Sequence, residues 1–256
     1  MANNPFNDLV QEIRFAGENG FQGFELMFEY PTTPETVMAR RKEILDVFST
    51  YNLLKLAHTQ SLVDISSVYE LVREASVKET IKAFETAHKL EIKFLTIHPG
   101  YQWPTISREE SLKKSYKTFK TLLKFAEEFD LTLGAENLPI RGFTKVEDFK
   151  ELFNLFPSER LKFVLDVSHA HLQNPRLPLD FLNNFYEKLG HVHLSDNSGD
   201  RDNHLPLGAG VVDYVSVVKE LKKRRYKETI TLEIFSKDRD YLLLSKKKVE
   251  NLFQNF

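Results

Sequence analysis

Histidines and acidic residues close most of the short apolar runs of this chain. Six of seven such runs carry one near the end, namely His58, His98, Glu136, Asp166, His193 and Glu233. One histidine in such a place is most often a structural residue with a satisfied hydrogen bond. A charged group in an apolar run is costly, however, unless it is paired or bound to a metal. Because the pattern recurs in six runs, it indicates a shared divalent-metal site.

Further residues of the same chemical types lie close to these positions. His169 stands one turn after the acid of the fifth run, and Asp202 and His204 lie between the last two runs. His191 and His193 are two positions apart, so both point to one side of an extended segment. The chain has no cysteine, so a metal would be held by imidazole and carboxylate donors alone. Such donors suit Zn²⁺, or Mn²⁺ and Mg²⁺ where oxygen atoms dominate.

The apolar runs alternate with longer stretches of helical periodicity. The runs span residues 23–28, 53–58, 92–98, 131–137, 162–167, 190–195 and 229–235. The helical stretches span residues 7–19, 34–51, 67–90, 108–130, 144–156, 178–188, 213–225 and 238–254. This alternation, with nearly continuous apolar strands, predicts parallel strands joined by helices. We therefore expect a single α/β domain over residues 1–256, folded as a (β/α)₈ TIM barrel.

The beginning of the chain departs from an eight-stranded pattern. Only residues 1–6 precede the first helical stretch, whereas seven strands are evident further along. The first strand is therefore expected to be very short or missing. Active sites of such barrels form at the carboxyl ends of the strands, where this chain places its acids and histidines.

Composition argues against several classes of function. The chain has 35 Lys and Arg against 37 Asp and Glu, a formal charge of −2, which offers no electrostatic case for nucleic acid or membrane. No stretch approaches the roughly 18 apolar residues of a membrane span, and residues 1–6 do not resemble a secretory signal. We expect a cytoplasmic enzyme with a small-molecule partner, and the sequence leaves its oligomeric state open.

Several motifs occur along the chain in a fixed order. They are Ile97-His98-Pro99-Gly100, Glu136-Asn137, Asp166-Val167-Ser168-His169, His193-Leu194-Ser195-Asp196 and the segment from Asp202 to Gly210. As an ordered set they resemble the xylose isomerase-like TIM-barrel superfamily. That superfamily holds sugar and sugar-phosphate isomerases and epimerases, together with the endonuclease IV group, or AP endonuclease family 2. The resemblance runs from Gly20 to Glu233.

Resemblance to the isomerases and epimerases implies one divalent metal held by two Glu, one Asp and one His. The matching residues are Glu136, Asp166, His193 and Glu233. The metal would polarise a ketose carbonyl, while Glu136 and Glu233 would move a proton between adjacent carbons through an enediolate. The partner would be a sugar or sugar phosphate, and Mn²⁺ or Mg²⁺ would suit the oxygen-rich site.

Resemblance to endonuclease IV instead implies three zinc ions and cleavage of DNA at abasic sites. Nine residues match that ligand set: His58, His98, Glu136, Asp166, His169, His193, Asp202, His204 and Glu233. The intervening residues differ, because Val167-Ser168 and Ser195-Asp196 stand where those nucleases usually have Thr-Cys and Asn-Asp. We favour the isomerase or epimerase, keep the zinc nuclease as the alternative, and retain as a third hypothesis a barrel that binds metal without turnover.

Overall fold

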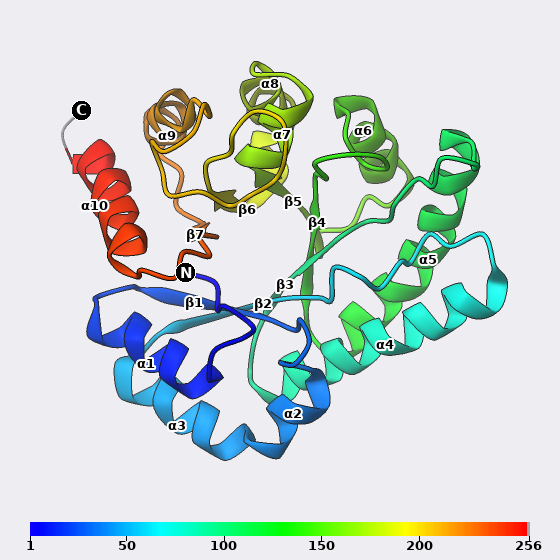
Figure 1. Cartoon of the computed structure of the whole chain (residues 1–256). Coiled ribbons are helices and arrows are strands. Elements are labelled where there is room, and N and C mark those ends of the chain that lie inside the picture. Colours follow the sequence, from blue (N-terminus) through cyan, green and yellow to red (C-terminus); the bar gives the residue numbers. More distant parts are fainter. Residues whose placement is uncertain (255–256) are drawn as a thin grey trace.

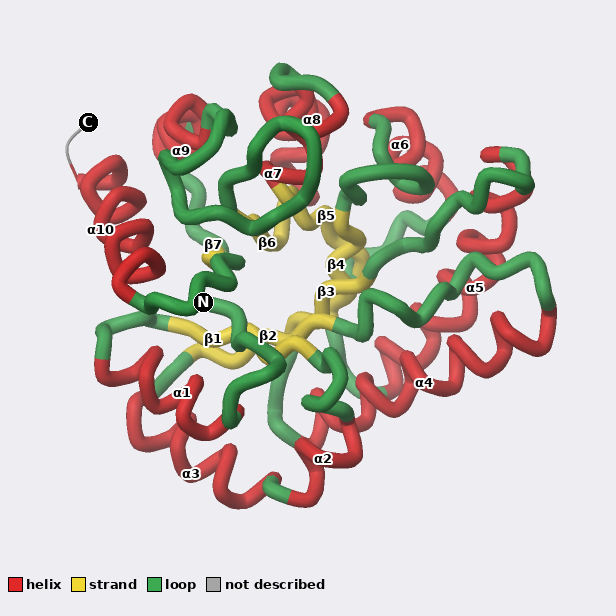
Figure 2. The backbone as a smooth tube through the Cα atoms, in the orientation of Figure 1, coloured by secondary structure: helices red, strands yellow, loops and turns green. Residues whose placement is uncertain are grey.

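The computed structural model describes residues 1–254 as a curved parallel sheet surrounded by helices (Figures 1 and 2). Seven strands pair in sequence order: β1 (Gly23–Met27), β2 (Leu54–His58), β3 (Phe94–Ile97), β4 (Thr132–Glu136), β5 (Leu161–Asp166), β6 (Leu189–Leu194) and β7 (Thr229–Leu232). Every pair of neighbours is parallel. The expected α/β barrel is confirmed, with its carboxyl strand ends on one face.

The helices connect successive strands on the outside of the sheet (Figure 2). They are α1 (Leu9–Glu18), α2 (Pro34–Ala39), α3 (Arg41–Tyr51), α4 (Glu70–Lys89), α5 (Arg108–Glu128), α6 (Val146–Leu155), α7 (Val167–Gln173), α8 (Leu177–Phe185), α9 (Tyr214–Lys223) and α10 (Asp240–Gln254), with a short 3₁₀ turn at Tyr186–Lys188. The helix expected over residues 34–51 is two helices, because the backbone leaves the helical conformation at Arg40. Helix α7 is additional to the expected set.

The N-terminal segment takes the place of a full first strand between β7 and β1 (Figure 1). Ala2 forms a single parallel bridge to Glu25, whose amide donates to the Met1 carbonyl at 2.9 Å. On the other side, the Ala2 amide donates to the carbonyl of Leu232 at 3.4 Å. The prediction of a very short first strand is therefore confirmed, and this stub links the two ends of the sheet.

Phenylalanines fill the space between the strands and the outer helices. Phe163 of β5 lies between Phe149 of α6 and Phe181 of α8, with ring centroids 4.8 Å and 5.2 Å away. All three rings are fully buried, and such pairs stabilise beyond the apolar area they remove from water. The packing holds β5 in place, so the residues at its carboxyl end have a rigid support.

No helix in residues 1–254 is long and apolar enough to cross a membrane.

Candidate functional site

A cavity of about 750 Å³ opens at the carboxyl ends of the strands. Seven of the nine predicted ligands line it: His58, His98, Glu136, His169, Asp202, His204 and Glu233. The other two, Asp166 and His193, are fully buried directly beneath these residues. His193 Nδ1 lies 2.9 Å from Glu136 Oε1, and Asp166 Oδ2 lies 3.7 Å from His169 Nδ1. The fold thus brings all nine residues into one continuous cluster.

Glu136, the last residue of β4, is the centre of this cluster. Its Oε2 lies 3.0 Å from the Nε2 atoms of both His58 and His98. Its Oε1 faces His193 of β6. The ligand atoms of the group His58, His98 and Glu136 lie within 4.8 Å of one another, as do those of the group Glu136, Asp166 and His193. Glu136 therefore belongs to two groups of donors that are able to hold a metal ion.

Asp166 ends β5 and also begins α7. Its Oδ1 accepts from the His169 amide at 2.7 Å and so caps the helix, which leaves Oδ2 facing the cluster. Asn137 fixes the same strand end, since its side chain accepts from the Asp166 amide and donates to the Asp166 carbonyl, both at 2.9 Å. This arrangement aims Oδ2 at His169 and His193.

Asp202 and His204 lie on the loop after β6, and Asp196 holds that loop in place. The buried Asp196 carboxylate accepts from the amides of Gly208, Gly210 and Val212 at 2.8–2.9 Å. Residue 210 must be glycine here, because a Cβ would lie 2.0 Å from the Asn197 carbonyl oxygen. The loop thereby brings Asp202 Oδ2 to 2.9 Å from His169 Nε2.

Replacing Asp196 by alanine should therefore loosen the whole loop. The change leaves several buried amides without an acceptor, so we expect the free energy of unfolding to fall by about 3 kcal/mol. Denaturant unfolding would measure the loss. The exposed Asp200 on the same loop provides a control, and Asp200→Ala should change stability by less than about 0.5 kcal/mol. Equal stability of the two variants would contradict this role of Asp196.

Charge is concentrated among these buried side chains. Burial alone would raise the pKa of Glu136, yet the facing His193 and His98 hold it well below its usual range. Burial would lower the pKa of His193, but the carboxylates around it raise that pKa well above the usual value. Burial raises the pKa of Asp166 to about 7. Glu136 and His193 thus stabilise each other's charged form, and a divalent cation can also stabilise carboxylates gathered in this way.

Unsatisfied polar atoms provide a test of whether this donor set fits a metal. Four buried atoms of the predicted ligands have no hydrogen-bond partner: Asp166 Oδ2, Asp202 Oδ1, His204 Nδ1 and Glu233 Oε1. Buried polar atoms are rarely left without a partner in folded proteins. Carboxylate oxygens and imidazole nitrogens are the donors that Zn²⁺ and Mn²⁺ accept. The residues present therefore fit a divalent metal ion.

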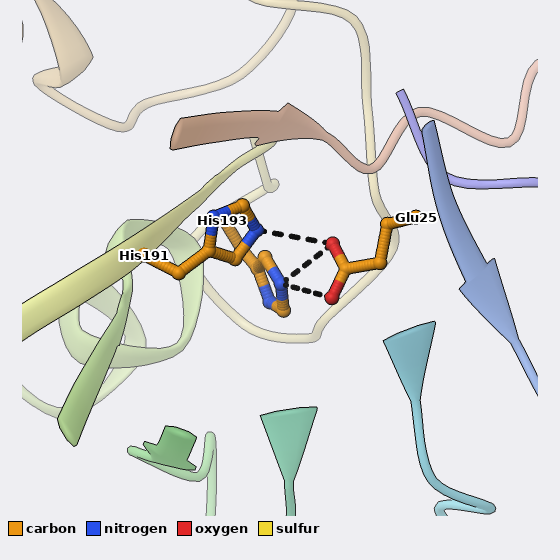
Figure 3. A group of neighbouring side chains, drawn as sticks. All are labelled: Glu25, His191 and His193. Carbon is orange, nitrogen blue, oxygen red and sulfur yellow. Dashed lines mark hydrogen bonds and ion pairs between the residues drawn. The ribbon is translucent and has the colours of Figure 1, made fainter. Parts of the chain in front are cut away.

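The sequence pattern gave no functional assignment to two residues that contact the cluster. Glu25 of β1 and His191 of β6 are fully buried beneath it, and Glu25 lies 3.1 Å from His193 Nε2 (Figure 3). The signal for Glu25 was present, since it is an acid within an apolar strand. Tyr101 also lines the cavity, and its hydroxyl contacts His98 Nδ1 at 2.6 Å.

A second cavity, of about 500 Å³, lies at the opposite ends of the strands. It is bordered by Phe21, Leu54, Ile230 and Phe253, between the edges of the sheet and α10. None of the predicted ligands lines it. This cavity lies toward the amino ends of the strands, whereas barrels of this type build their active sites at the carboxyl ends. The acid and histidine cluster therefore marks the candidate functional site.

Comparisons with known proteins agree with this architecture. The family model described as a xylose isomerase-like TIM barrel matches residues 13–252. An uncharacterized protein of Methanocaldococcus jannaschii is 26% identical over 235 residues, covering 88% of this chain and 78% of that protein. Fructoselysine 3-epimerase of Escherichia coli O157:H7 is 23% identical over 234 residues, covering 87% of this chain and 84% of the enzyme.

Solved structures include two that resemble this chain over nearly its whole length. The crystal structure of a D-tagatose 3-epimerase-like protein has a TM-score of 0.87 and 25% identity, covering 97% of this chain and 94% of that one. The IolI protein, solved with a zinc atom, has a TM-score of 0.82 and 19% identity, covering 98% and 94%. The second likeness is one of fold alone, and so are the likenesses to three epimerase structures that are 18–20% identical to this chain.

Proposed function

Because this chain belongs to the xylose isomerase-like TIM-barrel family, we propose that it is a divalent-metal-dependent epimerase or isomerase of a neutral ketose. The observation that carries the proposal is the set of three carboxylates around His193 Nδ1, those of Glu136, Glu233 and Asp166 at 2.9, 3.4 and 4.0 Å. The sugar 3-epimerases among the similar proteins support this class of reaction.

The proposed metal ligands are Glu136, Asp166, His193 and Glu233. Three carboxylates and one imidazole form an oxygen-rich set that suits Mn²⁺ or Mg²⁺, and Zn²⁺ also accepts these donors. When bound, the cation would polarise a ketose carbonyl and its neighbouring hydroxyl. The imidazole-rich remainder of the cluster, His58, His98, His169, Asp202 and His204, offers donors that suit zinc.

Proton transfer is assigned to Glu136 and Glu233. Both carboxylates line the cavity and both approach the same imidazole nitrogen, His193 Nδ1. One would accept the proton on the carbon beside the carbonyl, and the enediolate that forms would take a proton from the other. Tyr101 and Phe235, on the wall of the cavity, would help to exclude water from the reacting carbons.

The lining of the cavity favours an uncharged sugar over a sugar phosphate. Within residues 1–254, none of the side chains that line it is a lysine or arginine. The mouth carries Glu29 and the exposed apolar side chains of Phe6, Tyr30 and Leu62. A phosphate would meet like charge at Glu29 and would find no guanidinium or ammonium partner.

One observation favours the zinc nuclease as a second candidate. His169, Asp202 and His204 form a third donor group, with Asp202 Oδ2 lying 2.9 and 3.3 Å from the two Nε2 atoms. A single-metal epimerase does not need this group. A DNA duplex, however, is bound through its phosphates by lysine and arginine, which this cavity lacks. We therefore place the nuclease second.

Turnover of free and phosphorylated ketoses by Mn²⁺- or Zn²⁺-loaded protein tests the proposal. At least one free ketose should be epimerised or isomerised. Its kcat/KM should be at least about tenfold above that of its phosphate ester, because a buried charge without a partner is costly and tenfold corresponds to only about 1.4 kcal/mol. The chelated protein is the control. Preference for the phosphate ester would contradict the assignment of a neutral substrate, and inactivity of the loaded protein on all ketoses would contradict the reaction class.

A further inference from the structure

Beneath the proposed metal site lies a second layer of buried polar residues. Glu25 of β1 and His191 and His193 of β6 are each 0% exposed, and their side chains meet inside the barrel (Figure 3). Glu25 Oε2 lies 3.1 Å from the Nε2 atoms of both histidines. A carboxylate in this position is costly unless its lone pairs are satisfied, so its partners determine what it does.

Glu25 has only donors around it. Thr96 donates its hydroxyl to Oε1 at 2.9 Å, and an ionised carboxylate accepts but cannot donate. His191 and His193 must therefore both carry a hydrogen on Nε2. The other nitrogen of His191 lies 2.5 Å from the Thr229 hydroxyl, which satisfies that ring completely.

Nδ1 of His193 faces the cavity side of the cluster. That nitrogen lies 2.9 Å from Glu136 Oε1 and 3.4 Å from Glu233 Oε1. With Nε2 donating to Glu25, Nδ1 is the nitrogen whose lone pair is available to a cation among those carboxylates. We propose that Glu25 is a positioning residue that fixes the tautomer and direction of His193 so that Nδ1 becomes a metal ligand.

Three other histidines of the cluster, His58, His98 and His169, are oriented by uncharged groups, whereas Nδ1 of His204 has no hydrogen-bond partner. Nδ1 of His58 lies 2.6 Å from the Thr59 carbonyl, and Nδ1 of His169 lies 3.0 Å from the Asn137 carbonyl. Nδ1 of His98 faces the Tyr101 hydroxyl. His193 differs because Nε2, the nitrogen that points away from the cavity, donates to the buried carboxylate of Glu25. A carboxylate raises the basicity of the opposite nitrogen more than a carbonyl does. His193 is thus built to be a stronger imidazole donor than His58, His98 and His169.

Glu25, His191 and His193 do not form a further metal site of their own. Their ligand atoms are close enough together, but each is already used in the hydrogen bonds described above. Neither Glu25 nor His191 lines the cavity, whereas Glu136 and Glu233, the carboxylates beside His193 Nδ1, both do. Their position supports a role in holding His193, and this role rests on the proposed metal-dependent function.

The test is the affinity of the full chain for Zn²⁺, measured by competition with a chelator, in the wild type and in Glu25→Gln. The amide keeps the volume of the carboxylate but carries no negative charge, so it is a weaker acceptor for the two imidazole N–H groups. We expect zinc to bind about 10–100-fold more weakly. Glu12→Gln is the matched control, because Glu12 is a buried carboxylate outside the cluster that pairs with Arg239, and its zinc affinity should stay within twofold of the wild type.

Nitrogen NMR of ¹⁵N-histidine-labelled, zinc-loaded wild type gives a readout that does not depend on the folding of any variant. We expect His193 to carry its hydrogen on Nε2 and to bind zinc through Nδ1. Zinc on Nε2, or equal zinc affinity of Glu25→Gln and the wild type, would overturn the role of Glu25 alone. A wild type that binds no metal would overturn the proposed function as well, so the two failures are distinguishable.

Discussion

Replacing Glu233 by glutamine should lower the kcat for a free ketose by about 10²–10⁴-fold, the usual contribution of a positioned acid or base. Glu233 is 3% exposed, lines the cavity, and leaves Oε1 without a hydrogen-bond partner. The amide occupies nearly the same space but cannot take up the proton of the sugar carbon. Steady-state kinetics with metal content measured on the same samples would separate a lost proton transfer from lost metal.

Glu228 provides the control for this variant. It lies just before β7 on the same segment of chain, but it is exposed and borders the cavity at the opposite end of the barrel. Glu228→Gln should leave kcat within about twofold of the wild type, because a surface change away from the site has little effect. If Glu233→Gln kept its metal and full turnover, Glu233 would not be a proton-transfer residue.

Divalent metal should stabilise the folded chain strongly, and Glu136→Gln should remove that effect. A ligand that binds only the folded state at 100–1,000 times its Kd adds about 2.7–4.1 kcal/mol to the free energy of unfolding. For a chain of this size each kcal/mol raises Tm by about 2–4 °C, so the rise with metal should exceed about 5 °C. Glu136 is the carboxylate that faces His58, His98 and His193, so its loss affects two donor groups at once.

Thermal unfolding with and without Zn²⁺ or Mn²⁺ measures this effect. Asp148→Asn is a suitable control. Asp148 lies in the first turn of α6, away from the cluster, and its buried carboxylate pairs with Arg108 of α5. That variant should be less stable than the wild type but should gain the same amount from metal. A wild type whose Tm is the same with and without metal would contradict metal binding at the cluster.

Much of the fold could be predicted because the sequence pattern is local and repeated. Parallel strands buried on both faces are near-continuous apolar runs, and all seven expected runs became strands. The residues at their ends were predicted to meet because parallel strands all end on the same face of a barrel. The nine residues assemble there, and their roles as ligands stay proposals.

Other features depend on contacts that the sequence does not display. Helix α7 was missed because its first residues continue directly from a strand, with Asp166 serving both. The partners of Glu25 come from β3 and β6, about 70 and 170 positions away. Asp196 appeared within a motif, but its role in holding the loop of Asp202 and His204 depends on amides 12–16 residues further on. Such partners become visible only when the loop is folded.

Solvent exchange tests directly whether this site moves a proton on the carbon skeleton of a neutral ketose. Mn²⁺- or Zn²⁺-loaded protein would be incubated with free ketoses in D₂O, and deuterium on the carbon beside the carbonyl would be measured by NMR. We expect incorporation of deuterium that requires metal and is lost in Glu233→Gln. A loaded protein that exchanges no ketose proton, yet incises an abasic-site duplex in a Glu136-dependent manner, would contradict it and establish the nuclease instead.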